Sequence, residues 1–281
     1  MEQIQVMELA RELELPKEVQ QHLGSVMEGM PWEKLEPVIR DLTEYDSAQD
    51  AQVRLAQLAT LGGETPGMGQ MAGMLAAACD TREKYRDWGI PDSVFLATMK
   101  CFPRFLRETK QMTGEWIFDR AFWTWRQTSG LLFRLGTLEF EYVKDRGEPS
   151  LSVHIPSDAT LTCSELEKAY EEAEDFWERH EEALCPYGKP GSIRCCTWLL
   201  SPALEGLLPP DSGIRRFAQG YEIKTVFPER ESFYRWLFAG KKEWEELPEK
   251  TSLQRAVKAY LASGGRIGEA FGQLKPNRER G

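Results

Sequence analysis

The sequence predicts an α+β protein: a helical N-terminal domain over residues 1–128, followed by a mixed, mainly antiparallel sheet with flanking helices over residues 129–281. Two observations on the spacing of apolar residues indicate this fold class. Up to about residue 128, apolar residues recur every three or four positions, which is the period of an amphipathic helix. After Gly130 they alternate with polar residues, which is the period of a strand. A length of 281 residues is sufficient for two compact domains, each with its own core.

Successive amphipathic helices are predicted over the first half of the chain. Pro16 is placed for a first helical position, and Val19, Leu23 and Val26 follow at spacings of four and three, so they lie on one helix face. Pro31 opens a second helix in the same way. The same periodicity predicts further helices over residues 47–61, 68–88 and 91–111.

Two apolar groups in this half have more than one interpretation. Residues 67–78 are rich in methionine and small side chains, which predicts a tightly packed core helix, with an adaptable groove for a partner as the alternative. Four aromatic residues then follow at short spacing. We predict their burial between the two domains, with the floor of a ligand pocket as the alternative. They are Trp116, Phe122, Trp123 and Trp125.

A β-hairpin is predicted directly after the change of period. Apolar and polar residues alternate over 131–143 and again over 151–155. The polar stretch 144–149 between them is typical of a turn. Strands joined by so short a turn pair antiparallel.

The polar face of this hairpin contains the candidate catalytic residues. If Val143 lies opposite Ser150, then Glu139 lies opposite His154, and Glu141 lies on the same face. A carboxylate beside an imidazole favours its protonated form and fixes its tautomer, so Glu139 and His154 are the candidates for a proton-relay pair. The sequence alone favours the alternative, an ordinary charge pair on a solvated face, because perturbed pairs are also common in structural networks.

Helices and strands are both predicted beyond the hairpin. The stretch from Ser157 to Ser164 leads into an acidic helix with one apolar stripe. Thr162 and Ser164 each have a glutamate three positions later, which fits a capping box. Strands are expected over 193–200 and 221–227. Short helices are expected after a cap at Asp211 or Ser212 and over 233–236, and a last helix from Thr251 or Ser252 to Gly264. Residues 267–272 are spaced by glycines but follow a helix, so they make only a weak phosphate motif.

Composition limits the classes of function. Forty-five acidic residues against 35 basic ones give a net charge of −10, which repels phosphate backbones, so no nucleic-acid partner is expected. The chain shows neither a secretory signal pattern nor an apolar run of bilayer length, so a cytoplasmic protein without a membrane partner is expected. The six cysteines lack the spacing of a zinc site and the density of a disulfide scaffold, so reduced, mostly buried thiols and no metal are expected.

Short segments spread over the second half of the chain resemble a known family. They are Arg134 to Phe140, His154 to Ser157, Thr197 to Pro202 and Tyr221 to Ile223. These segments resemble the GNAT-like C-terminal domain of bacterial acyltransferase-domain proteins, and the helical first half resembles the N-terminal domain that accompanies it. The resemblance implies an acyl-CoA N-acyltransferase fold. Acetyl-CoA or another acyl-CoA would then enter, as co-substrate, where two neighbouring strands splay apart.

Two functions are open on this basis. As an N-acyltransferase, the chain would move an acyl group to an amine of a small molecule or peptide, and Glu139 or His154 would deprotonate that acceptor. The amides near Ser157, Thr162 and Ser164 would receive the phosphates of the CoA. The alternative is a non-catalytic binding or scaffold protein that retains a degenerate acyltransferase fold. The loop before the acidic helix has no glycine, unlike the family's pyrophosphate loop, which favours the alternative; the clustered acidic residues and His154 favour the enzyme.

Overall fold

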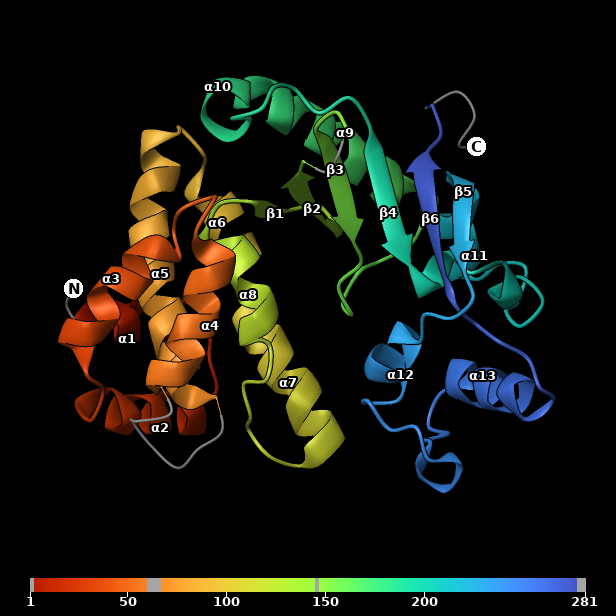
Figure 1. Cartoon of the computed structure of the whole chain (residues 1–281), viewed down its shortest axis with the longest axis horizontal. Helices are drawn as coiled ribbons and strands as arrows, with labels where there is room; N and C mark the ends of the chain where they lie inside the picture. The colour runs from red at the N-terminus through yellow and green to blue at the C-terminus, as the bar shows by residue number, and fades with distance from the viewer. Residues whose placement is uncertain (1–2, 60–66, 145–146, 277–281) are drawn as a thin grey trace. The chain divides into compact units, whose positions relative to one another are not determined.

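The computed structural model describes residues 3–59, 67–144 and 147–276, and Figure 1 shows its helices and strands. Helices dominate as far as Thr128, and the described strands lie between Leu132 and Leu274. The α+β fold class is therefore confirmed. The chain forms two compact units, which are Met1–Leu135 with Phe176–Pro186, and Gly136–Asp175 with Tyr187–Gly281.

The first unit is built mainly from the helices that the periodicity predicts. Its described elements are α1 (Gln3–Glu12), α2 (Lys17–Glu28), α3 (Trp32–Asp41), α4 (Ala48–Ala59), α5 (Met68–Asp87), α6 (Asp92–Met99), α7 (Cys101–Thr113), α8 (Ala121–Thr128), β1 (Leu132–Leu135), the end of α9 (Cys163–Arg179) and α10 (Glu181–Leu184). Pro16 and Pro31 are the N-cap residues of α2 and α3, one position before the first helical position that was predicted for Pro16. Residues 60 and 61, at the end of one predicted helix, lie outside the described residues.

The segment predicted as a single helix over residues 91–111 is two helices, α6 and α7, which meet at Lys100. Pro103 gives the physical reason. Within an uninterrupted helix Pro103 would have no N–H to donate to the carbonyl of Met99, and its ring would clash with that carbonyl. Because α7 begins anew at Cys101, Pro103 falls in its first turn, where no intrahelical donor is required. The single-helix prediction was wrong for this reason.

The methionine-rich run lies in the core of the first unit. Met68 and all residues from 71 to 78 of α5 are buried. A Cβ atom at Gly73 would lie 2.5 Å from Cδ1 of Leu55, so α5 and α4 approach closely at this point. The interpretation as a tightly packed core helix is therefore confirmed.

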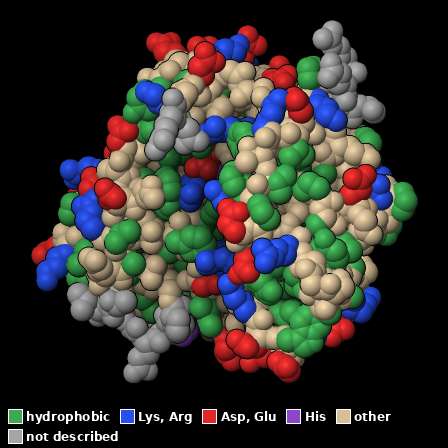
Figure 2. All heavy atoms as spheres, turned by 45° about the vertical axis from the view of Figure 1, so that its right-hand side comes forward, with side chains coloured by type: hydrophobic (Ala, Val, Ile, Leu, Met, Phe, Trp, Pro, Cys, Tyr) green, Lys and Arg blue, Asp and Glu red, His purple; other side chains and the backbone are tan. Residues whose placement is uncertain are grey.

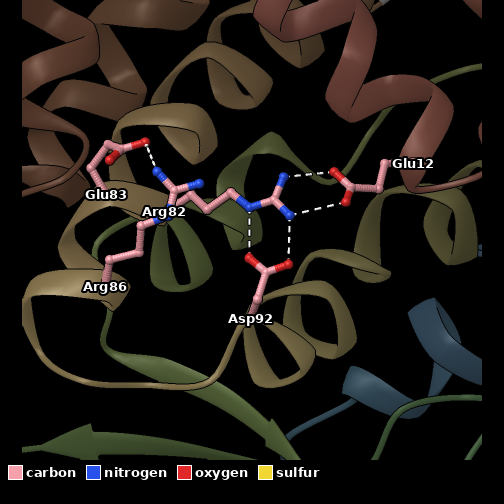
Figure 3. Close-up of polar contacts among 5 residues, drawn as sticks. All are labelled: Glu12, Arg82, Glu83, Arg86 and Asp92. Carbon is pink, nitrogen blue, oxygen red and sulfur yellow. Dashed lines mark hydrogen bonds and ion pairs between the residues drawn. The ribbon is translucent and has the colours of Figure 1, made fainter.

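A double ion pair joins three helices of the first unit (Figure 3). The guanidinium of Arg82 on α5 donates to both carboxylate oxygens of Glu12 on α1, at 2.6 and 2.9 Å. It also donates to both carboxylate oxygens of Asp92 on α6, at 2.7 and 2.6 Å. These hydrogen bonds lower the pKa of both carboxyl groups. Because the folded pKa values lie below the unfolded ones, the stabilisation is present above about pH 4.5 and is lost as the pH falls through the folded values.

Replacing Arg82 by glutamine is expected to lower the free energy of unfolding by about 1 kcal/mol at pH 7. The expected loss is small because the Glu12 and Asp92 side chains are 40% and 50% exposed, so water screens both pairs. Urea unfolding at pH 7 and at pH 3 measures this effect. The difference between wild type and Arg82→Gln should shrink at pH 3, where the carboxyl groups become protonated.

Arg86→Gln, on the same helix, is the matched control. Arg86 pairs with Glu83 one turn earlier, and these side chains are 59% and 66% exposed, so the loss should be well under that of Arg82→Gln. Equal losses for the two variants at pH 7, or an Arg82 effect that is the same at both pH values, would contradict the assigned role of Arg82.

Six strands form one open, mixed sheet in the order β1-β2-β3-β4-β6-β5. The strands that follow β1 are β2 (Leu138–Val143), β3 (Ser150–His154), β4 (Ile193–Thr197), β5 (Tyr221–Phe227) and β6 (Glu269–Leu274). Strands β3 and β4 are parallel, whereas β2 with β3, β4 with β6 and β5 with β6 are antiparallel. The mixed, mainly antiparallel sheet is therefore confirmed.

The predicted hairpin is formed by β2 and β3 in the predicted register. Glu139 lies opposite His154, and Val143 lies opposite Ser150. Asp145 and Arg146 of the predicted turn lie outside the described residues. Alternation of apolar and polar residues was therefore sufficient to fix the register of this hairpin.

Strand β6 was not predicted from the sequence, although it pairs with both β4 and β5. Residues 267–272 were considered only as a weak phosphate motif. Gly272 explains the omission, because glycine has a low strand propensity. In the sheet, a Cβ at Gly272 would lie 3.1 Å from Cβ of Tyr221 and 3.2 Å from Cδ1 of Leu200, so the close packing favours glycine here.

Helix α9 covers one face of the sheet in the second unit. The ring of Phe140 on β2 meets the ring of Tyr170 on α9 edge to face, with centroids 6.3 Å apart. Tyr170 meets Tyr221 on β5 in the same way, at 6.5 Å. Phe140 lies opposite Val153 in the hairpin, so the apolar side chains of both strands point toward α9.

The remaining helices of the second unit begin at caps that the sequence predicts. Ser212 accepts the N–H of Ile214 at the start of α11 (Gly213–Gln219). Thr251 and Gln254 form a reciprocal capping box at the start of α13 (Ser252–Ala262). The aromatic helix predicted over residues 233–236 is α12 (Ser232–Leu237). The strand predicted over residues 193–200 is shorter, because residues 198–200 form a 3-10 turn instead of extending β4. An apolar cluster of buried side chains forms the core of this region. Its members are Trp198, Leu204, Phe233, Phe238, Leu247, Val257 and Ile267.

Charged side chains of both signs are interspersed on the face shown in Figure 2. Lysine and arginine lie among aspartate and glutamate there, with apolar side chains between them. In the part of the chain that the structure describes, no helix has both the length and the apolar composition needed to cross a membrane.

Candidate active site

The candidate active site lies on the polar face of the sheet in the second unit. Side chains alternate along a strand, so Glu139, Glu141 and His154 lie on the face opposite α9. Glu139 and Glu141 are only 2% and 7% exposed. Buried carboxylates require hydrogen-bond partners, so the alternative of a solvated polar face does not describe these two residues.

The imidazole of His154 forms a hydrogen bond with Glu141. Its Nε2 lies 2.7 Å from Oε2 of Glu141, and both side chains are largely buried. Glu141 is the diagonal neighbour of His154, which long side chains can reach, and Glu139, the partner predicted from the sequence, lies directly across the hairpin on the same face. If Nε2 donates to this carboxylate, Nδ1 has the acceptor lone pair. The pair therefore has the arrangement of a base that a carboxylate orients.

Strands β3 and β4 stop pairing before they end. Their last registered pair is Ser152 with Arg194, although β3 continues to His154. Strand β4 also continues, and it pairs with β6 on its other side. Beyond the last pair, the carbonyl of Val153 accepts a hydrogen bond from the thiol of Cys195 at 3.2 Å. Registered backbone pairing of β3 with β4 therefore ends at Ser152 and Arg194, and this thiol–carbonyl hydrogen bond links the strands beyond it.

The three predicted phosphate-binding residues surround the N-terminus of α9. Ser157, Thr162 and Ser164 are all exposed. The hydroxyl of Thr162 accepts the N–H of Glu165 at 3.3 Å, and Oγ of Ser164 lies 3.3 Å from the same hydroxyl. The N–H groups of a first helical turn, together with the helix dipole, attract anions. The predicted residues therefore lie at a helix end whose chemistry suits a phosphate.

Two neighbouring elements hold the loop that leads into α9. The N–H of Thr160 donates to the hydroxyl of Thr137 at 2.6 Å. The guanidinium of Arg216 on α11 donates to the carbonyl of Leu161 at 3.0 Å and to that of Asp211 at 3.2 Å. These contacts position the start of α9 although the loop contains no glycine.

Sequence reasoning missed a second group of polar residues on the polar face of the sheet. Cys196, Arg230 and Glu269 come within hydrogen-bonding distance of one another, although Cys196 and Glu269 are 73 residues apart in the sequence. The group was missed because it requires β6, which was not predicted. The available signal was the alternation of Glu269, Phe271 and Gln273 with smaller or apolar residues.

The cysteines are free thiols, and three of the six are buried. Cys163 and Cys196 are the two that are exposed. Within residues 3–59, 67–144 and 147–276, no group of three or more histidine, cysteine, aspartate or glutamate side chains is placed to hold a metal ion.

Solved acyltransferase structures have the same fold. An acyltransferase in complex with CoA and 10C-teicoplanin superposes with a TM-score of 0.75 at 24% identity, over 95% of this chain and 86% of that one. An acyltransferase in complex with decanoyl-CoA and teicoplanin superposes with a TM-score of 0.68 at 22% identity, over 96% of this chain and 99% of that one. Another, with decanoyl-CoA, gives 0.67 at 20% identity, over 96% and 98%. A search of curated proteins gave no significant match.

The fold is therefore that of an acyltransferase, and two family models define the class further. The N-acyltransferase N-terminal domain matches residues 4–130, and the GNAT-like C-terminal domain matches residues 132–274. The chain belongs to the N-acyltransferase-type family that combines these two domains, as the sequence resemblance indicated.

Proposed function

We propose that this protein transfers an acyl group from acyl-CoA to an amine acceptor. The principal supporting observation is the end of β3, where registered pairing with β4 stops and His154, bonded to Glu141, lies on the polar face. Membership of an N-acyltransferase-type family supports the reaction class. The three related structures, which contain CoA or decanoyl-CoA, support the co-substrate.

In this proposal the acyl-CoA lies along the C-terminal end of β3, with its pyrophosphate at the N-terminus of α9. The hydroxyl of Thr162 already caps the helix, so the N–H groups of the first turn would bind the phosphate oxygens. Ser157 and Ser164 are exposed beside them and would add hydroxyl donors.

His154 would act on the acceptor in this reaction. The amine must lose a proton to attack the thioester carbonyl, and an imidazole can accept that proton. The carboxylate of Glu141 at 2.7 Å would then stabilise the imidazolium that forms. Glu139, directly across from His154 on the same face, is the second carboxylate available to this site.

Replacing Ser164 by aspartate tests the position of the pyrophosphate. A carboxylate in the first turn of α9 should stabilise the helix by about 0.5 kcal/mol through the dipole. It should at the same time weaken CoA binding by about 10-fold or more, because it repels the phosphate charge. Urea unfolding and calorimetric CoA titration measure the two effects, which have opposite signs.

Ser164→Asn is the matched control, since it keeps the size of aspartate without its charge. Asparagine should leave CoA affinity within about threefold of wild type. Equal CoA affinity for the aspartate and asparagine variants would exclude the start of α9 as the pyrophosphate site.

The alternative function is a binding or scaffold role that retains the fold without the reaction. The loop into α9 without glycine is the observation that favours it. CoA at 100 times its dissociation constant should stabilise an active enzyme by about 2.7 kcal/mol, which raises the melting temperature by several degrees. No shift at millimolar CoA, and no CoA release from decanoyl-CoA with a panel of primary amines, would favour the scaffold.

A further inference from the structure

An arginine lies on the polar face of the sheet in the second unit, just after the end of β5. The guanidinium carbon of Arg230 is 3.9 Å from the ring centroid of Phe227. Its Nη1 lies 3.4 Å from Oε2 of Glu269 and 3.5 Å from the sulfur of Cys196. Phe227 and Glu269 are paired residues of β5 and β6, so both point to this face. The ring and the carboxylate therefore hold the guanidinium in place.

Arg230 retains the donors that bind an anion. Its side chain is 47% exposed, whereas that of Glu269 is 13% exposed. Their contact at 3.4 Å is longer than the roughly 2.8 Å of a strong charged hydrogen bond. Among the residues that the structure describes, Nε and Nη2 of Arg230 have no hydrogen-bond partner. These two nitrogens lie on one side of the guanidinium and match the two oxygens of a carboxylate.

Strand register relates this guanidinium to the proposed base. Ser152 on β3 and Arg194 on β4 are paired. His154 and Cys196 follow two positions later on the same strands, so they point to the same face. Neighbouring strands are about 5 Å apart, and Nη1 of the guanidinium lies 3.5 Å from the sulfur of Cys196. A carboxylate bound to the guanidinium would therefore lie roughly 10 Å from His154.

The guanidinium lies on the other face of the sheet from the helix at which the CoA pyrophosphate is proposed to bind. Helix α9 packs on the apolar face, where Tyr170 meets Phe140 (Figure 1). Arg230 lies on the polar face, with His154. Arg230 is therefore on the side of the sheet where the amine acceptor would lie.

We infer that the acceptor carries a carboxylate, which Arg230 binds while the amine lies at His154. This inference rests on the proposed function and defines the class of its acceptor. A separation of roughly 10 Å is the length of about three residues of extended chain. The acceptor is therefore an amine with a carboxylate at the distance found in a tripeptide.

Triglycine and triglycinamide test this inference, because they share an amine and differ in the terminal charge. With decanoyl-CoA as donor, the wild-type kcat/KM should be about 10-fold or more higher for triglycine, mainly through KM. Arg230→Gln should lower the ratio of the two kcat/KM values to about one. Arg230→Lys should give an intermediate ratio, since lysine keeps the charge without the paired N–H groups.

Two controls accompany the measurement. Glycine and glycinamide test the distance, because the carboxylate of glycine is too close to its amine to reach Arg230; their ratio should be the same in wild type and Arg230→Gln. Arg255→Gln is the matched control on the protein, since Arg255 is exposed on α13 and donates to the carbonyl of Glu249. Its ratio for the two tripeptides should equal that of wild type.

The outcomes separate this inference from the proposed function. Equal acylation of both tripeptides by the wild type, or acylation of uncharged amines but of neither tripeptide, overturns the inference and leaves the proposed function intact. A lower affinity of Arg230→Gln for decanoyl-CoA would assign Arg230 to a phosphate of CoA, which also overturns the inference alone. Absence of CoA release with every amine overturns both.

Discussion

Replacing His154 by glutamine is expected to lower kcat by about 100-fold or more, while the affinity for acyl-CoA remains nearly unchanged. The imidazole is the group to which the proposed mechanism assigns the amine proton, and glutamine retains hydrogen-bonding capacity without basicity. Steady-state kinetics with decanoyl-CoA and a responsive amine measure kcat, and calorimetric titration measures the affinity.

The two glutamates on the same face provide the comparison. Glu141→Gln should reduce kcat less than His154→Gln, and the double variant should be no slower than His154→Gln alone, because residues that act as a unit are not additive. Glu139→Gln should also reduce kcat less than His154→Gln, because that variant retains the imidazole base. A greater loss with either glutamate variant than with His154→Gln, or unchanged kcat in His154→Gln, would contradict this assignment.

Replacing Phe133 by alanine is expected to lower the free energy of unfolding by about 3–5 kcal/mol. Phe133 on β1 is 0% exposed. Its ring centroid lies 5.3 Å from that of Tyr85, 4.8 Å from that of Phe176 and 5.4 Å from that of Trp177. The variant would leave a cavity among three large rings, which cannot collapse without moving α5 or α9. Urea unfolding of the wild type and of the alanine variant measures the loss.

Two variants calibrate that result. Phe133→Leu retains most of the buried volume and should cost less than half as much as alanine. Met112→Ala on α7 removes a side chain of a residue that is 40% exposed, and it should change the free energy of unfolding by about 0.5 kcal/mol or less. Similar losses for Phe133→Ala and Met112→Ala would show that the aromatic cluster does not stabilise the first unit.

The sequence by itself determined the elements whose signals are local. The spacing of Val19, Leu23 and Val26 was sufficient for α2, and alternation was sufficient to place Glu139 opposite His154. Both results follow from which side chains share one face of a single element or of two strands joined by a short turn. Most helices, the hairpin and the location of the polar face could be predicted in this way.

Only the tertiary structure decided the contacts between residues distant in sequence. Insertion of β6 between β4 and β5 brings Glu269 to Cys196, across 73 positions of sequence. Pairing of β3 with β4 joins residues 42 positions apart in sequence and places His154 beside β4, and its end after Ser152 is likewise set by the tertiary structure. The hydrogen bond between His154 and Glu141 depends on side-chain reach across one face, which register alone does not specify. Periodicity reports which face a residue occupies, whereas the neighbour on that face depends on strand order and packing, to which the whole chain contributes.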